Sequence, residues 1–172
     1  MRSHGMTTLS YDRAKGHSTQ YDVVALGYNY RMDDIRAALG IVQLEKLAID
    51  IEKRQAVRRN YVKELIKQPD ILIPFSNDPN YVSNYIMPVV LLGKNNKQKN
   101  AIREFLDKRG IQTSVHYPPV HRFKIYDCFA LNALRHTEQF SDCALTLPMY
   151  GSLSKENISY ICHSLQDAMH EE

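Results

Sequence analysis

Three neighbouring side chains near the start of the chain could bind an anion. Asn29, Tyr30 and Arg31 present an amide, a phenol and a guanidinium just before a predicted helix start at Asp33 or Asp34. The N-terminus of a helix offers unpaired N–H groups and a favourable dipole to an anion, and a guanidinium can clamp a phosphate through two hydrogen bonds. The alternative is a capped turn with a solvated arginine, which is the commoner arrangement. Residue types alone leave both interpretations open.

Two histidines, His116 and His121, are the other candidates for binding. They are five positions apart and flank two prolines. No cysteine or carboxylate lies near them at a regular spacing, so we expect no metal. The three cysteines include no CxxC pair, and we expect small reduced core residues rather than nucleophiles or disulfides: Cys128, Cys143 and Cys162.

A charged helical stretch could in principle contact nucleic acid through four basic residues: Lys53, Arg54, Arg58 and Arg59. Acidic residues at positions 50, 52 and 64 can pair with them, which favours a solvated face. No aromatic residues alternate with the basic ones, and a net charge of +3 is too small to indicate a nucleic-acid partner. We expect no nucleic acid and keep this as the weakest alternative.

Four segments, taken in order, resemble one enzyme family. The segment GYNYRMDDIRAALGIVQLEKL, residues 27–47, is similar to the C-terminal half of the DegT/DnrJ/EryC1/StrS aminotransferases. These enzymes use pyridoxal phosphate (PLP) to aminate keto-sugars attached to nucleotides. The other three segments resemble the family's RxHG, GIxTxxHYxPLH and SLPL-type elements: Arg2–Gly5, Gly110–His121 and Leu145–Met149. Together the four segments cover essentially the whole chain.

The resemblance implies a fold and roles for particular residues. The chain would be the small C-terminal lobe of a fold-type-I PLP aminotransferase, an α/β (α+β) lobe with a short, mostly antiparallel sheet packed with helices. Asn29 would reach the PLP phosphate of the partner subunit in a homodimer. Five further residues would lie at the nucleotide-sugar or the dimer contact: Tyr30, Arg31, His116, Tyr117 and His121. Val120 and Met149 depart from the family's pattern, and neither touches the implied chemistry.

The family's catalytic lysine has no counterpart in this sequence. Transamination through PLP needs a lysine amine that holds the cofactor as a Schiff base and then moves a proton. In the family this lysine lies in an SxHxxK-like motif before the RxHG segment, and no such motif occurs here. The neighbours of Lys15, the nearest lysine, do not resemble it.

We therefore expect no catalytic residue in this chain. PLP, an amino-acid donor and a nucleotide-sugar would belong to the complete enzyme, and the chain alone would be inactive. Its apolar surface would be covered by the large domain and the partner subunit. The alternative is a stand-alone, non-catalytic binding or regulatory module derived from this lobe.

Composition agrees with a folded domain. The chain has 172 residues, of which 44% are hydrophobic and 24% charged, enough apolar material for a packed core. No apolar run approaches the length that a membrane span needs, and the N-terminal segment is polar. With the reduced thiols, these features predict a cytoplasmic protein without membrane contact.

Hydrophobic periodicity indicates the elements that would position these residues. Helices are expected at about 33–47, 50–67, 101–109, 136–144 and 155–169. Strands are expected at 21–26, 85–92, 111–115 and 145–147. We divide the chain into an irregular lead from the missing large domain, 1–26, and a small C-terminal domain, 27–172. The small domain includes the long helical connection 33–68.

Overall fold

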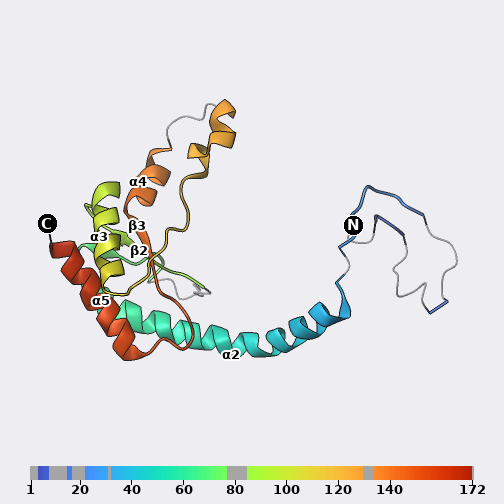
Figure 1. Cartoon of the computed structure of the whole chain (residues 1–172), viewed down its shortest axis with the longest axis horizontal. Helices are drawn as coiled ribbons and strands as arrows, with labels where there is room; N and C mark the ends of the chain where they lie inside the picture. Colours follow the sequence, from blue (N-terminus) through green and yellow to red (C-terminus); the bar gives the residue numbers. More distant parts are fainter. Residues whose placement is uncertain are drawn as a thin grey trace. The chain divides into compact units, whose positions relative to one another are not determined.

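The computed structural model describes residues 4–7, 15–16, 22–30, 32–76, 85–129 and 134–171. The chain divides into two compact units, Met1–Leu47 and Ala48–Glu172, and each is considered by itself. Figure 1 traces the elements along the chain. The boundary between residues 26 and 27 that the sequence suggests stays a prediction.

The first unit has little regular structure before its helix. Met6 and Val23 form an isolated antiparallel bridge. The strand predicted at 21–26 is therefore wrong for the described residues 22–26. No strand forms there because no other element packs against this segment: the side chains of Val23, Val24 and Leu26 are all exposed.

Gly5 is held close to the opposite segment of this unit. Its φ is +69°, and a Cβ atom there would lie only 2.0 Å from the carbonyl oxygen of Ala25. Gly5 also accepts a hydrogen bond from the N–H of Val24 at 3.0 Å. Only glycine fits this position, which explains the glycine of the RxHG-like segment in physical terms.

Helix α2, Asp34–Leu65, is one continuous helix of 32 residues. It begins as the sequence predicts, because the Asp33 carboxylate accepts a hydrogen bond from the N–H of Arg36 at 2.9 Å. The prediction of two helices, at 33–47 and 50–67, is wrong. Residues 41–65 contain neither glycine nor proline, so nothing breaks the helix between them.

The change of pattern along α2 reflects a change of surroundings. In the first unit its large apolar side chains are exposed: Ile35, Leu39, Ile41, Val42 and Leu44. In the second unit it buries Val57, Arg58, Tyr61 and Leu65. The amphipathic pattern predicted at 33–47 is therefore present in α2, and the large apolar side chains of that stretch are exposed.

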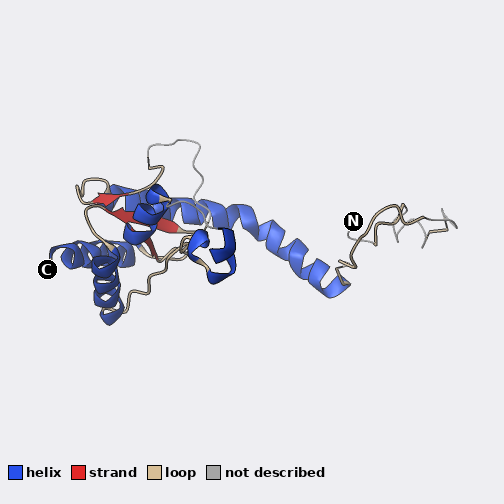
Figure 2. Cartoon of the chain, turned by 90° about the horizontal axis from the view of Figure 1, so that it is seen from above, coloured by secondary structure: helices blue, strands red, loops and turns tan. Residues whose placement is uncertain are grey.

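The second unit contains a three-stranded antiparallel sheet in the order β1-β2-β3. The strands are β1, Ile71–Leu72, β2, Met87–Leu91, and β3, Ala144–Leu147. The predictions of β2 and β3 are confirmed, whereas two residues carry too little pattern for β1 to be predicted. Figure 2 shows the strands with helices packed around them.

The strand predicted at 111–115 is wrong, and its partner β3 explains why. Ser114 and Thr146 form an isolated bridge: the N–H of Ser114 donates to the Thr146 carbonyl at 3.0 Å, and the N–H of Thr146 donates to the Ser114 carbonyl at 2.8 Å. The next hydrogen-bonded pairs of such a ladder would need the N–H groups of residues 148 and 144. Pro148 has no N–H, and the N–H of Ala144 donates to the Phe140 carbonyl at the end of α4. The ladder therefore stops after one bridge.

Local signals position the remaining helices. Helix α3, Asn96–Lys108, begins with a capping box in which Asn95 and Gln98 exchange hydrogen bonds of 3.1 Å. It ends at Gly110, φ +73°, where the N–H of Ile111 reaches the Leu106 carbonyl at 2.9 Å. The other helices are two 3-10 helices, η1 (Val120–Arg122) and η2 (Lys124–Phe129), and two α-helices, α4 (Arg135–Cys143) and α5 (Lys155–His170).

The core of the second unit joins α2, the sheet, α3 and α5. Helices α3 and α5 contact each other (Figure 1). The hydroxyl of Ser154, which the sequence marks as an N-cap residue, accepts a hydrogen bond from the N–H of Asn157 at the start of α5. Fully buried side chains come from all these elements: Tyr61, Leu65, Met87, Val89, Leu91, Leu106, Leu145, Ile158, Cys162 and Leu165. The expected fold class, a small antiparallel sheet packed with helices, is confirmed.

Candidate functional site

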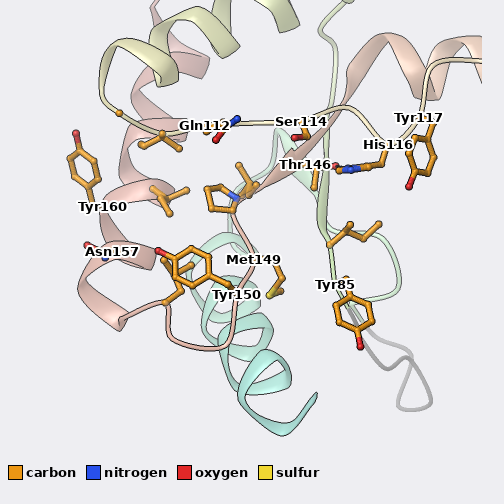
Figure 3. A pocket seen from close by; sticks show the side chains of 17 residues that line it. Tyr85, Gln112, Ser114, His116, Tyr117, Thr146, Met149, Tyr150, Asn157 and Tyr160 are labelled. Carbon is orange, nitrogen blue, oxygen red and sulfur yellow. Dashed lines mark hydrogen bonds between the residues drawn. The ribbon is translucent and has the colours of Figure 1, made fainter. Parts of the chain in front are cut away.

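A cavity of about 860 Å³ lies in the second unit (Figure 3). Its walls come from residues 85–86 before β2, the segment 110–117, the end of β3 with the loop that follows it, and α5. Polar side chains around it are Gln112, Ser114, His116, Thr146 and Asn157. The described residues that line it include no lysine, arginine, aspartate or glutamate. The cavity therefore offers amide, hydroxyl and imidazole groups without a fixed charge.

Aromatic rings complete the walls. Tyr85, Tyr117, Tyr150 and Tyr160 all line the cavity, and each combines a flat apolar face with a hydroxyl group. In Figure 3, Tyr85 and Tyr150 lie across the cavity from Gln112 and the 114–116 segment. Neutral polar groups combined with aromatic faces suit an uncharged ring that carries hydroxyl or carbonyl groups.

His116 lies at one wall of the cavity and is anchored to the sheet. Its Nδ1 atom is 3.1 Å from the hydroxyl oxygen of Thr146. The ring of Tyr117 meets the His116 ring edge-on, with centroids 5.0 Å apart and an interplanar angle of 89°. Tyr117 itself is 76% exposed. The structure thus brings His116 and Tyr117, both predicted site residues, to the same cavity.

Helix α2 fixes the part of the wall that follows β3. The buried hydroxyl of Tyr61 donates to the Pro148 carbonyl at 2.9 Å, and burial raises the pKa of this phenol well above its usual range. Arg54 donates to the Met149 carbonyl at 3.0 Å and lies 4.9 Å from the centroid of the Tyr85 ring. Two side chains of one helix thereby hold two consecutive carbonyls of the lining.

His121 lies outside this cavity lining. Its Nε2 atom is 2.9 Å from a carboxylate oxygen of Glu138 in α4, and Arg122 pairs with the same carboxylate at 3.2 Å. The hydrogen bond from His121 holds the pKa of Glu138 below its usual range, with Arg122 adding to the effect. These contacts show His121 tying η1 to α4, and the described structure does not bring it together with His116 and Tyr117.

The remaining predicted residues belong to the first unit. Asn29 and Tyr30 are exposed, and the Tyr30 ring stacks on Tyr28 with centroids 5.2 Å apart. Arg31 lies outside the described residues. Their predicted roles at the PLP phosphate and the nucleotide-sugar stay predictions.

A second, smaller cavity of about 500 Å³ is basic in character. Lys99, Arg103 and Arg122 line it together with Asp142. Lys99 is only 4% exposed and donates to the Ser141 carbonyl in the last turn of α4. Burial lowers the pKa of this amine, and nearby Asp142 opposes the shift. None of these four residues lines the cavity of His116.

A metal site and a membrane-spanning helix each require features that the described residues do not show. Its residues contain no group of three or more histidine, cysteine, aspartate or glutamate side chains that could hold a metal. Within the described ranges, no helix has the length and apolar character that a membrane crossing needs. The three cysteines are free, and only Cys162 is buried. The prediction of core cysteines is wrong for Cys128, which is exposed, and Cys143 is half-buried.

Several lining residues were not predicted as site residues. Gln112, Ser114 and Thr146 lie in or beside the matched segments 110–121 and 145–149, so those segments were a usable signal. Asn157 and Tyr160 reach the cavity from α5, and no local pattern distinguishes them from surface residues of a helix.

Known proteins resemble this chain in both sequence and fold. The model of the DegT/DnrJ/EryC1/StrS aminotransferase family matches residues 1–166. The chain is 32% identical over 167 residues to the UDP-4-amino-4,6-dideoxy-N-acetyl-beta-L-altrosamine transaminase of Helicobacter pylori. This match covers 95% of the chain and 42% of the relative. A dTDP-4-dehydro-2,3,6-trideoxy-D-glucose 4-aminotransferase of Saccharopolyspora spinosa is 30% identical over 171 residues, covering 96% and 43%.

The fold is shared with a solved member. The structure of the Helicobacter pylori aminotransferase involved in the biosynthesis of pseudoaminic acid superimposes with a TM-score of 0.84 at 28% identity. The superposition covers 99% of this chain and 44% of the Helicobacter pylori chain. The chain therefore spans less than half the length of the relatives that it matches. On its sequence and its fold, it belongs to the DegT/DnrJ/EryC1/StrS aminotransferase family.

Proposed function

We propose that this chain supplies the C-terminal part of a PLP-dependent aminotransferase that acts on a keto-sugar attached to a nucleotide. An amino acid would donate the amino group. The uncharged, aromatic cavity around His116 would form part of the wall that holds the sugar-nucleotide. This cavity is the observation that carries the proposal, because two of the segments that resemble the family, 110–121 and 145–149, meet there. The names of the relatives, which act on UDP- and dTDP-linked sugars, support the substrate class.

The cavity does not by itself fit PLP. Its described lining has no lysine amine for the cofactor's aldehyde and no cation for its phosphate. The proposal therefore assigns the cofactor to the complete enzyme, with Asn29 contributing to the phosphate of the partner subunit's PLP in a homodimer. Tyr30, Arg31 and His121 are assigned to the nucleotide-sugar or the dimer contact by resemblance alone.

Exposed apolar residues support the view that the chain acts as a component. Ile35, Leu39 and Val42 are all exposed on α2, although apolar residues at this spacing normally face a core. The remaining part of a complete enzyme, or its partner subunit, would cover them.

A stand-alone binding module is the second candidate. Every described residue that lines the cavity belongs to the second unit, so no described residue of the first unit is needed to form it. Such a module would bind a nucleotide-sugar and perform no chemistry.

A binding experiment tests the proposed substrate class. We expect UDP-N-acetylglucosamine, used as a probe for nucleotide-linked sugars, to shift the backbone NMR resonances of Gln112, Ser114 and His116. His116→Ala removes one hydrogen-bonding group and is expected to weaken binding roughly tenfold. The matched control is His136→Ala, because His136 is exposed on α4 and lines neither cavity described above.

Binding of equal strength in the two variants would contradict the assignment of His116. Shifts confined to the basic cavity of Lys99 would contradict the proposed site as a whole.

A labelling experiment tests whether this chain carries the cofactor's lysine. After incubation with PLP and reduction by borohydride, we expect no lysine to be modified stoichiometrically. The lysine to watch is Lys99, because a lowered pKa increases the share of the amine that is unprotonated and able to attack an aldehyde. Its burial and its bond to Ser141 are expected to keep it unmodified. Peptide mapping of the chain and of a Lys99→Met variant provides the measurement.

One lysine modified in full, at Lys99 or elsewhere, would show that the chain holds the cofactor itself.

A further inference from the structure

We propose that Thr146 is a positioning residue that fixes His116 in one tautomer, with its proton on Nε2, so that His116 presents a neutral N–H donor to the cavity. The assignment of the ligand as a nucleotide-linked sugar rests on the proposed function. The assignment of the tautomer rests only on the contacts of these two residues.

Thr146 fastens the His116 segment to the sheet at three points. Its N–H and its carbonyl exchange hydrogen bonds of 2.8 and 3.0 Å with Ser114, and its hydroxyl is 3.1 Å from Nδ1 of His116. Thr146 is 7% exposed and lies in the middle of β3, so its hydroxyl is held by the sheet rather than by a loop. Figure 3 shows the His116 ring lying next to Thr146. Because β3 is paired with β2 in the sheet, the sheet fixes the position of the hydroxyl that the His116 ring contacts.

The hydroxyl of Thr146 determines which ring nitrogen carries the proton. A neutral imidazole has one donor and one acceptor nitrogen, and a hydroxyl group has a single proton to give. Among the described residues, this hydroxyl has no hydrogen-bonding partner other than His116. If Nδ1 donated to the hydroxyl, the hydroxyl proton of this largely buried residue would have no acceptor among the described residues, an arrangement that folded proteins seldom adopt. Donation from the hydroxyl to Nδ1 satisfies both groups and leaves the ring proton on Nε2.

Nε2 is then the nitrogen left for a ligand. It has no hydrogen-bonding partner within the described residues, and His116 lines the cavity. An N–H donor recognises an oxygen acceptor, such as a hydroxyl or carbonyl oxygen of a sugar or a nucleobase. Groups fixed by a neighbour behind them lose less freedom when the ligand binds, so the bond from Thr146 is expected to increase affinity.

Nitrogen NMR of the chain labelled with ¹⁵N-histidine tests the tautomer without any ligand. The resonances of His116 are identified by their loss in His116→Asn. We expect Nδ1 to resonate as an unprotonated nitrogen and Nε2 as a protonated one. Thr146→Val keeps the shape of the side chain but removes the hydroxyl, and we expect the ring to lose this single-tautomer pattern. Thr146→Ser retains the hydroxyl and is expected to restore it.

Two outcomes would overturn the proposal: a protonated Nδ1 in the unaltered chain, or an unchanged ring in Thr146→Val. If Thr146→Val does not fold, the tautomer of the unaltered chain and the result for Thr146→Ser still decide the question. For UDP-N-acetylglucosamine we expect Thr146→Val to bind about tenfold more weakly and Thr146→Ser to bind within about twofold of the unaltered chain. A chain that has the expected tautomer but binds no UDP-sugar would refute the proposed function and leave the role of Thr146 standing.

Discussion

Replacing Leu65 by alanine is expected to lower the free energy of unfolding by about 2–5 kcal/mol. Leu65 is fully buried at the last residue of α2, where it belongs to the hydrophobic core of the second unit. The substitution removes buried methyl groups and leaves a cavity that the sheet and the neighbouring helices can fill only in part. Urea denaturation followed by circular dichroism measures the change.

Leu44→Ala is the matched control, because it makes the same change in the same helix. Leu44 is 69% exposed, so its replacement is expected to alter the free energy of unfolding by no more than about 0.5 kcal/mol. Both variants are measured at low protein concentration, where contacts between copies of the chain contribute little. Equal losses at the two positions would mean that residue 65 is not part of the core described above.

Alkaline pH is expected to destabilise the second unit through Cys162. Burial, with a smaller contribution from Glu64, raises the pKa of this thiol from 9.0 to about 12. Between these values the unfolded chain loses the thiol proton while the folded chain keeps it, so stability falls as the pH rises. The loss attributable to this thiol is about 1.4 kcal/mol for each pH unit across that window, and the full contribution is present below it.

Cys162→Ala isolates this effect from other groups that titrate in the same range. The raised pKa of Tyr61 acts in the same direction, because the buried phenol also keeps its proton in the folded state. The comparison is therefore between the slopes of unfolding free energy against pH for the two proteins. We expect a shallower slope above pH 9 in the variant. Parallel curves would show that Cys162 does not titrate differently in the folded and unfolded states.

Elements whose signals are local could be predicted from the sequence. The cap at Ser154, the stop at Gly110 and the apolar run of β2 all act within a few residues, and the structure contains the features they indicate. The capping box at Asn95 was missed, so α3 begins at Asn96 rather than near residue 101. The break between two helices near residue 48 was an error of interpretation. A change in periodicity marked where α2 passes from an exposed to a buried environment, and only glycine or proline would have interrupted its hydrogen bonding.

Features that depend on distant residues could not be predicted. Whether residues 111–115 form a strand is decided by Pro148 and by the N–H of Ala144, about thirty positions away along the chain. The same limit applies to the candidate site. His116 and Tyr117 lie in a recognisable segment, whereas Thr146 and Asn157 gain their significance only when β3 and α5 are placed beside that segment. His121 lies five residues after His116 and nonetheless faces Glu138.

Because only a single bridge joins Ser114 to Thr146, the residues that form the cavity rim are largely separate from those that hold the sheet together. The three strands satisfy their hydrogen bonds without residues 115–119, so the backbone there can change its length or course without disturbing the sheet. Those residues include His116 and Tyr117, which form a rim of the cavity. Under the proposed function, ligand preference can therefore change through insertions, deletions and exchanges in this short stretch, while the hydrogen bonds of the sheet are kept.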